Sequence, residues 1–207
     1  SLDQIGPITK TVADAEKIYQ VIAGLDENDA TTCDAKFFET KKDEKLKIGV
    51  PRQLIASGVA PDVLANFEQT LEKLKQAGHE IVEIELPTVK YALACYYIIS
   101  PAEVSSNLAR FDGLRYGLKK EGSNLLEDYL QTRGSGFGPE TRRRIILGTY
   151  VLSAGYYEAY YGQATRVREV IKQDFARAFS QVDTIILPTA PTTAFKLGEK
   201  SGDPLQM

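Results

Sequence analysis

The feature that most constrains the fold is a strand–helix–strand pattern at residues 47–86. Lys47–Val50 is a short apolar segment typical of a strand, and Pro61–Ala77 carries apolar residues at helical spacing after an initial proline. Gly78 is placed to end this helix, and Glu80–Leu86 is typical of a second strand. A helix of this length is the usual crossover between parallel strands. The sequence therefore predicts an α/β fold with a mixed, mostly parallel sheet flanked by helices.

A helix is also predicted near the start of the chain. Thr11-Val-Ala-Asp14 resembles a capping box with aspartate in place of the usual glutamate. Apolar residues follow at helical spacing, and Gly24 is placed as a stop, so we expect a helix with one buried face. Residues 26–44 are polar and charged, and we expect them to cross the surface as a connection without chemistry.

The second half of the chain is predicted to be mainly helical. Tyr91–Leu108 is typical of a helix, broken or kinked near Pro101 because proline removes a backbone donor and clashes with the preceding turn. Glu140–Val182 is strongly helical, with an interruption expected at Gly148 or Gly155.

A third strand is expected at Thr184–Leu187, buried and followed directly by Pro188–Thr193. Ligands in open α/β sheets gather at the carboxyl ends of strands, so the segment after this strand can form a wall of a site. A rigid structural turn would have the same sequence. Both interpretations remain open at this point.

Composition excludes several classes of function. With 207 residues, 43% of them hydrophobic and 26% charged, the protein can bury a sizeable core as one domain. A net charge of -3 gives no basis for a nucleic-acid groove, so any RNA contact would be local or made by a partner. No apolar run is long enough to span a bilayer, and no signal pattern opens the sequence. We expect a cytoplasmic protein.

Cysteine and histidine usage narrows the chemistry further. Cys33 and Cys95 are far apart and lack metal-ligand spacing, so we expect neither a disulfide nor a zinc site. The single histidine, His79, follows the predicted helix stop at Gly78, where a surface or capping role is expected. Histidine-based triads and multi-histidine metal sites are thereby excluded, and no bound cofactor is expected.

Two segments are candidates for carrying chemistry. Gly134–Gly138 supplies neither a nucleophile-elbow pattern nor a phosphate-binding loop, so it is interpreted as a flexible connection, and Ser135 is not a candidate nucleophile. Arg142–Arg144 are predicted in the first turn of a helix, where cations oppose the helix dipole. An arginine there could bind the carboxylate of a small amino acid through two hydrogen bonds, although a solvated basic turn would look the same. Most of the tyrosines are expected to pack, and a minority to line a pocket.

Several segments together resemble the amidase-signature family from one end of the chain to the other. Ser1–Val12 resembles the stretch that follows the Gly/Ser-rich signature of that family. Within the family, further segments resemble the glutamine-hydrolysing subunits of tRNA-dependent amidotransferases: Asn107–Gly117, Arg143–Thr149, Gly155–Tyr161 and Leu187–Phe195.

The resemblance implies glutamine hydrolysis by a Ser, cis-Ser, Lys triad, with ammonia passed to a partner subunit that amidates misacylated tRNA. Such a triad needs no histidine. Its lysine and both serines are expected upstream of the segment that Ser1 matches, so no catalytic residue is assigned. Residues 1–207 are then expected to be one partial amidase-signature domain, truncated at both ends and inactive alone. Sheet edges left unpaired by the truncation would favour self-association.

For the substrate, the resemblance implies that Arg144 holds the glutamine carboxylate and that a tyrosine of the pair Tyr96 and Tyr97 lines the pocket. A further carboxylate is expected beyond Met207. ATP and Mg²⁺ are expected at a partner subunit, and the expected partners are the B and C subunits of the amidotransferase and, mainly through them, misacylated tRNA. Two alternatives are a general amidase acting on small amides and a non-catalytic α/β interaction module.

Overall fold

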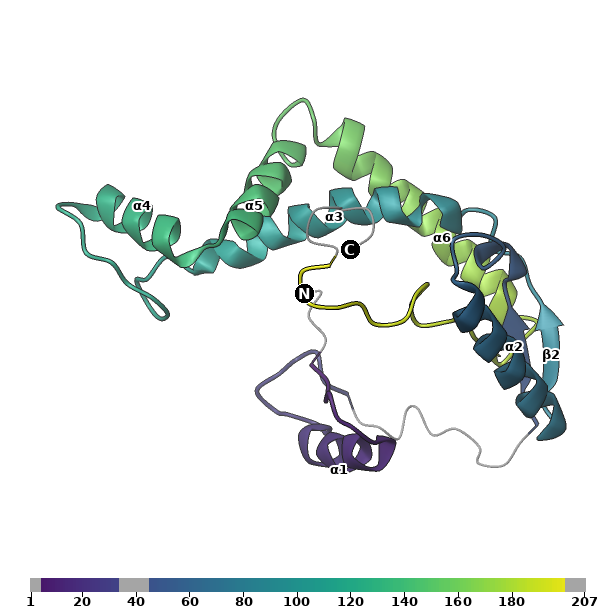
Figure 1. Ribbon diagram of the computed structural model, residues 1–207. Coiled ribbons are helices and arrows are strands. Elements are labelled where there is room, and N and C mark those ends of the chain that lie inside the picture. Colours follow the sequence, from purple (N-terminus) through teal and green to yellow (C-terminus); the bar gives the residue numbers. More distant parts are fainter. Residues whose placement is uncertain (1–4, 34–44, 200–207) are drawn as a thin grey trace. The chain divides into compact units, whose positions relative to one another are not determined.

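The computed structural model describes residues 5–33 and 45–199 (Figure 1). These residues belong to two compact units, one before and one after the gap between the two ranges. The first holds helix α1, and the second holds the sheet and the other helices. The single-domain assignment for residues 1–207 stays a prediction.

Helix α1, Val12–Ile22, begins and ends where the sequence predicts. The hydroxyl oxygen of Thr11 accepts a hydrogen bond from the backbone N–H of Asp14 at 3.1 Å, and the same hydroxyl donates to the Asp14 carboxylate at 2.8 Å. The helix ends just before Gly24, whose φ of 156° is one that L side chains rarely adopt. The cap and the stop are therefore confirmed.

The prediction that α1 buries one face is wrong for this structure. None of its residues is buried, and Val12 and Ile18 are 86% and 45% exposed. Residues 5–33 contain no second helix or strand, so the described part of this unit offers no second element against which the apolar face can pack. Residues 26–33 form turns at the surface, as expected for a connection, and the rest of the predicted connection lies outside the described residues.

The sheet has three strands in the order β2-β1-β3, and both pairs are parallel. Its strands are β1 (Lys47–Val50), β2 (Glu80–Glu83) and β3 (Thr184–Ile185). Ile48 in the central strand is paired with Ile81 on one side and with Thr184 on the other. The parallel sheet is thus confirmed. β2 and β3 are shorter than predicted, and β3 is only partly buried.

Helix α2, Pro61–Gln76, connects β1 to β2 and opens with proline at its first position. At its end the N–H of His79 donates to the Leu74 carbonyl at 3.1 Å, across Gly78, which has a φ of 94°. This is the Schellman arrangement, which requires a residue in the left-handed region and favours glycine. The backbone N–H of His79 therefore takes part in the cap, as predicted, and its Nδ1 atom accepts a hydrogen bond from the Leu46 N–H at 3.2 Å, just before β1.

The core lies on both faces of the sheet because neighbouring strand residues point to opposite sides. Ile81 and Ile186 pack with the cluster that includes Phe67 and Leu71 of α2. Their neighbours Val82 and Ile185 pack instead with a second cluster around helix α6, Gln163–Phe179. The buried members of the two clusters are Val50, Ile55, Phe67 and Leu71, and Ile84, Leu86, Ala178 and Val182.

Two further helices pack along each other beyond the sheet, α3 (Ala92–Asn107) and α5 (Pro139–Val151), and α3 also contacts α6 (Figure 1). Helix α3 runs through Pro101 without a break, so of the two predicted outcomes the break is wrong and the kink stays a prediction. Pro101 is buried against α5, and this packing stabilises a helix that proline alone would interrupt.

The long helical segment of residues 140–182 is interrupted between α5 and α6. Gly155 lies in this interruption with a φ of 86°, as predicted, whereas Gly148 lies inside α5. A short π-helix, Glu158–Gly162, precedes α6. Three 3-10 turns are also present in the described part of the chain: Arg52–Leu54, Val89–Tyr91 and Leu108–Arg110.

Helix α4, Leu125–Gly136, includes residues that the sequence predicts to be a flexible connection. Gly134–Gly136 form its last turn, and the Ser135 hydroxyl donates to the Gln131 carbonyl at 2.6 Å. Local hydrogen bonding of this kind occupies the hydroxyl, in agreement with the exclusion of Ser135 as a nucleophile. Only Phe137 and Gly138 separate α4 from α5.

Candidate functional site

A cavity of about 750 Å³ lies between helices α3 and α5. The structure therefore brings together the three residues that the sequence assigned to substrate binding, Tyr96, Tyr97 and Arg144. The cavity is lined by Tyr96, Tyr97, Ser100 and Pro101 from α3 and by Glu140, Arg143, Arg144 and Leu147 from α5.

The close approach of the two helices explains why these side chains meet. Gly148 lies so near α3 that a methyl group in its place would overlap the carbonyl oxygen of Pro101. Residues at a spacing of four lie on one face of a helix, so Glu140, Arg144 and Gly148 form a single stripe along α5. The stripe that contacts α3 at Gly148 thus carries Arg144 one turn earlier, where the two helices leave space between them.

The arginines of the cavity are held by a carboxylate from the same helix. Arg144 donates from Nε to Oε1 of Glu140 at 2.9 Å, and Arg143 donates from Nε and Nη2 to the two oxygens of Glu140, also at 2.9 Å. The hydrogen bond from Arg143, followed by that from Arg144, holds the pKa of Glu140 below its ordinary value. The side chains of Arg144 and Glu140 remain 46% and 53% exposed, so a ligand in the cavity can reach them.

The placement of Arg142–Arg144 in the first turn of a helix is right for Arg142 alone. Helix α5 begins at Pro139, so Glu140 and Arg142, the fourth residue, lie in the first turn, and Arg143 and Arg144 follow in the second. An acid near the helix N-terminus is favoured by the dipole, and the cations lie farther from the positive end. The local cost expected for this triplet is therefore smaller than the sequence suggested.

The two tyrosines of α3 contact each other edge to face, with ring centroids 5.4 Å apart. Each is half exposed, and both line the cavity, so the structure does not single out one of them. Tyrosine offers an apolar ring and a hydroxyl that donates or accepts a hydrogen bond. Together with Arg144, the pair provides one cationic group and two hydroxyls for a small polar ligand.

A second cavity, of about 190 Å³, lies at the carboxyl end of the sheet. Pro188 to Pro191 form one wall of it, as the sequence suggested for the segment after the third strand, and Leu54, Ile55 and Val59 form the other. The Pro191 carbonyl accepts a hydrogen bond from the Ala60 N–H at 2.8 Å, which fixes this wall. The lining of this cavity is mainly apolar and has no charged group, so it could hold a ligand by packing against it.

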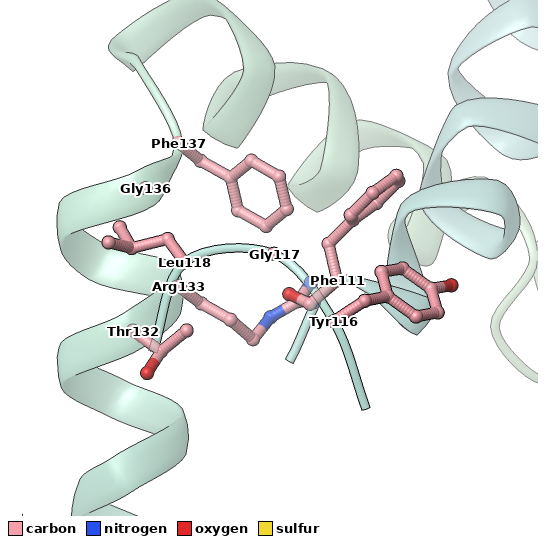
Figure 2. A pocket seen from close by; sticks show the side chains of 8 residues that line it. All are labelled: Phe111, Tyr116, Gly117, Leu118, Thr132, Arg133, Gly136 and Phe137. Atoms are coloured by element: carbon pink, nitrogen blue, oxygen red, sulfur yellow. The ribbon is translucent and has the colours of Figure 1, made fainter. Parts of the chain in front are cut away.

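A third cavity, of about 180 Å³, lies between α4 and the loop that precedes it (Figure 2). Figure 2 shows Arg133 reaching from α4 toward Phe111. Its guanidinium donates to the carbonyls of Leu108 at 3.0 Å and Phe111 at 3.2 Å, and it lies over the Phe137 ring at 4.9 Å. These contacts tie the loop to α4, and they give Arg133 a structural role.

Most other tyrosines pack against one another, as expected. Tyr150 and Tyr156 have ring centroids 4.3 Å apart, and a side-chain hydrogen bond with Tyr156 raises the pKa of Tyr150 to about 12. Tyr161 donates to Glu103 at 3.4 Å. Cys33 and Cys95 are both free.

The described residues hold neither a cluster of metal ligands nor a membrane span. Within residues 5–33 and 45–199, no three His, Cys, Asp or Glu side chains come together as a possible metal site. In the same part of the chain, no helix combines the length and apolar character needed to cross a bilayer.

The profile of the amidase family matches residues 1–207, and the chain belongs to this family. It is 53% identical to the A subunit of the glutamyl-tRNA(Gln) amidotransferase of Novosphingobium aromaticivorans and 52% identical to that of Roseiflexus castenholzii. Both alignments cover all of this chain and 43% of the relative, so the chain spans less than half the length of these proteins. The resemblance drawn from the sequence is confirmed.

Solved structures agree with this assignment. The crystal structure of the A subunit of glutamyl-tRNA(Gln) amidotransferase from Thermotoga maritima superposes with a TM-score of 0.64 at 39% identity, over 98% of this chain and 40% of that one. A crystal structure of an amidase superposes with a TM-score of 0.63 at 22% identity, over 94% of this chain and 37% of that one, which supports the fold. The predicted α/β fold class is confirmed.

Neither Glu140 nor Gly148 was assigned to the site from the sequence. Glu140 had a visible signal, because it precedes Arg143 by three residues and Arg144 by four, the spacings at which helical ion pairs form. Gly148 had none, since its contact with Pro101 joins two helices that are remote in sequence.

Proposed function

We propose that this chain is part of the glutamine-hydrolysing subunit of a cytoplasmic tRNA-dependent amidotransferase. The observation that carries the proposal is the cavity that joins Arg144 with Tyr96 and Tyr97. The names of the relatives, which are the A subunits of glutamyl-tRNA(Gln) amidotransferases, support the same activity.

In this proposal the cavity binds the amino-acid end of glutamine. The guanidinium of Arg144 offers paired N–H donors to the α-carboxylate, a geometry that matches the two oxygens of that group. The tyrosine rings flank the aliphatic part of the substrate, and their hydroxyls are available as hydrogen-bond partners. Holding the substrate at its α-carboxylate directs the side-chain amide toward the nucleophile.

The hydrolysis breaks the C–N bond of the glutamine amide, and water supplies the oxygen of the new carboxylate of glutamate. The ammonia that leaves is passed to a partner subunit, which converts Glu-tRNA(Gln) to Gln-tRNA(Gln) or Asp-tRNA(Asn) to Asn-tRNA(Asn). The proposed nucleophile and its base are the Ser, cis-Ser, Lys triad of the full-length protein, so residues 1–207 contribute the binding wall. ATP and Mg²⁺ act at the partner, and the B and C subunits complete the complex.

The decisive variant is Arg144→Ala in the full-length protein. We expect its kcat/KM for glutamine to fall by a factor that corresponds to about 1.5 to 3 kcal/mol of lost binding free energy, the range for a charged hydrogen bond. Most of the change should be in KM. The measurement is ammonia release over a range of glutamine concentrations.

Arg142→Ala is the matched control, because it removes the same charge two residues earlier in the sequence. Arg142 lines a different cavity, which lies between α4 and α5. Its KM should stay within about twofold of the parent value, since exposed charges away from the ligand act weakly. Equal effects of the two variants, or an unchanged KM in Arg144→Ala, would remove Arg144 from the site. Hydrolysis of many small amides at the rate of glutamine would favour a general amidase instead.

A further inference from the structure

Glu140 is the one acidic residue that lines the cavity between α3 and α5 among the residues the structure describes there. We infer that Glu140 is a positioning residue, which holds the Arg144 guanidinium so that the substrate carboxylate binds to its two terminal amino groups. This inference rests on the proposed function, in which Arg144 binds glutamine.

The geometry of the pair carries the inference. Glu140 accepts the Nε–H of Arg144 at 2.9 Å, and the Arg144 side chain makes no other hydrogen bond within the described residues. A guanidinium can present a carboxylate with either the Nε side or the end formed by its two Nη groups. Because Glu140 occupies the Nε donor, the end remains available to a ligand. Glu140 therefore selects one of the two modes of binding.

Arg143 strengthens this arrangement. It donates from Nε and Nη2 to both oxygens of Glu140, so the carboxylate is fixed by a second side chain as well as by its own helix. A free arginine side chain loses much of its rotamer freedom when it binds a ligand. An arginine already held in place loses less on binding, which is the usual advantage of preorganisation. The ion pair is exposed, so it contributes little to stability and its effect belongs to binding.

The inference is testable because net charge alone predicts the opposite effect of removing Glu140. Two arginines and one glutamate leave a net charge of one positive unit around the cavity, and removing Glu140 would raise it to two. If charge alone mattered, loss of Glu140 would improve binding of a carboxylate. If Glu140 positions Arg144, its loss weakens binding. The two effects differ in sign.

The test uses the full-length protein and three single variants. In Glu140→Ala we expect the KM for glutamine to rise about tenfold with kcat nearly unchanged, the pattern of lost ground-state binding. In Glu140→Gln the amide oxygen still accepts the Nε–H, so KM should return to within about threefold of the parent. Arg143→Ala removes the second anchor of the Glu140 carboxylate but leaves the bond to Arg144, so its KM should rise by less than that of Glu140→Ala.

A double variant separates positioning from a general structural effect. Once Arg144→Ala is present, adding Glu140→Ala should raise KM no further, because the two residues act as one unit. A structural role would instead lower the midpoint of thermal unfolding and reduce kcat in both backgrounds.

The outcomes also separate this inference from the proposed function. An unchanged or lower KM in Glu140→Ala, beside a raised KM in Arg144→Ala, overturns the positioning role and leaves the proposed function intact. Equal impairment by alanine and glutamine at this position likewise overturns it, since the hydrogen bond would then be irrelevant. An unchanged KM in Arg144→Ala overturns both.

Discussion

The sheet region and the pair of helices α3 and α5 bury their residues in different ways. Around the sheet, large apolar side chains fill the interior, and Val50, Leu71 and Leu86 are 0%, 2% and 1% exposed. Between α3 and α5 the buried contact is made by small residues and backbone, with Gly148 against Pro101. The aromatic side chains that this pair places around the cavity, Tyr96 and Tyr97, remain half exposed.

This difference shows how the two regions divide their roles. Close packing of large apolar groups supplies stability because it removes the most apolar surface from water. A backbone contact at one point lets two helices approach there and leaves room one turn away. The sheet region thus stabilises the fold, and the helix pair shapes a site. Variants in the two regions should therefore separate loss of stability from loss of the site.

The largest loss of stability is expected from Leu71→Ala in the sheet region. The free energy of unfolding should fall by about 2 to 5 kcal/mol, because a fully buried leucine leaves a cavity when it is truncated. Leu93→Ala on α3 is the matched control: Leu93 is 64% exposed, and its truncation should change stability by no more than about 0.5 kcal/mol. Urea unfolding followed by circular dichroism measures both, and similar losses would contradict the comparison.

Gly148→Ala should cost less stability and more function. The added methyl group overlaps the Pro101 carbonyl, so the helices must separate, at about 1 to 3 kcal/mol of unfolding free energy. The KM for glutamine in the full-length protein should rise, because Arg144 moves away from the tyrosines. A stable variant with an unchanged KM would show that this contact does not shape the cavity.

The matched control is Gly134→Ala in α4, where an added methyl group meets open space. Alanine in a helix is favoured over glycine by about 0.5 to 1 kcal/mol, so this variant should be slightly more stable than the parent. The same substitution is thus expected to have opposite signs in α4 and α5.

The smallest effect is expected where the two regions join. Asp174 of α6 is 1% exposed. It accepts hydrogen bonds from the N–H of Thr88 at 2.8 Å and from the Thr88 hydroxyl, and Thr88 lies just before α3. Asp174 also forms an ion pair with Arg177. The bonds from Thr88, with a smaller contribution from Arg177, lower the pKa of Asp174 below its ordinary value of 3.8.

A lowered pKa in the folded protein means that Asp174 stabilises the fold above pH 3.8 and that this contribution is lost as the pH falls through the folded-state pKa. Asp174→Asn should therefore flatten the acid side of a plot of unfolding temperature against pH, while it lowers the plateau near neutral pH. An acid limb as steep as that of the parent would assign the pH dependence to other carboxylates.

Much of the fold follows from the sequence, and the exceptions have a common physical cause. Helices α1 and α2 both carry apolar residues at helical spacing, yet α2 buries Phe67 and Leu71 and α1 buries none. Periodicity shows which face of a helix is apolar, whereas burial depends on what packs against that face. The same limit applies to α4, where a glycine-rich segment expected to be a connection completes a helix.

The candidate site was predictable in part. Arg144, Tyr96 and Tyr97 came from a resemblance between segments, and the structure places all three at one cavity. Their role in glutamine binding stays a prediction until Arg144→Ala is measured. Glu140 was accessible to helical spacing rules, but its relevance depended on knowing which face of α5 lines the cavity.

The sequence by itself determined two features set by contacts within a few residues, the Thr11 cap and the turn at Gly78. It also determined the parallel connection from β1 to β2, which follows from the length of the helix between them. Only the tertiary structure decided which apolar faces are buried, how Pro101 is accommodated and where α3 and α5 leave a cavity. The reason is that local hydrogen bonds and backbone sterics are encoded in neighbouring residues. Packing between helices depends instead on side chains remote in sequence, whose pairing no short segment specifies.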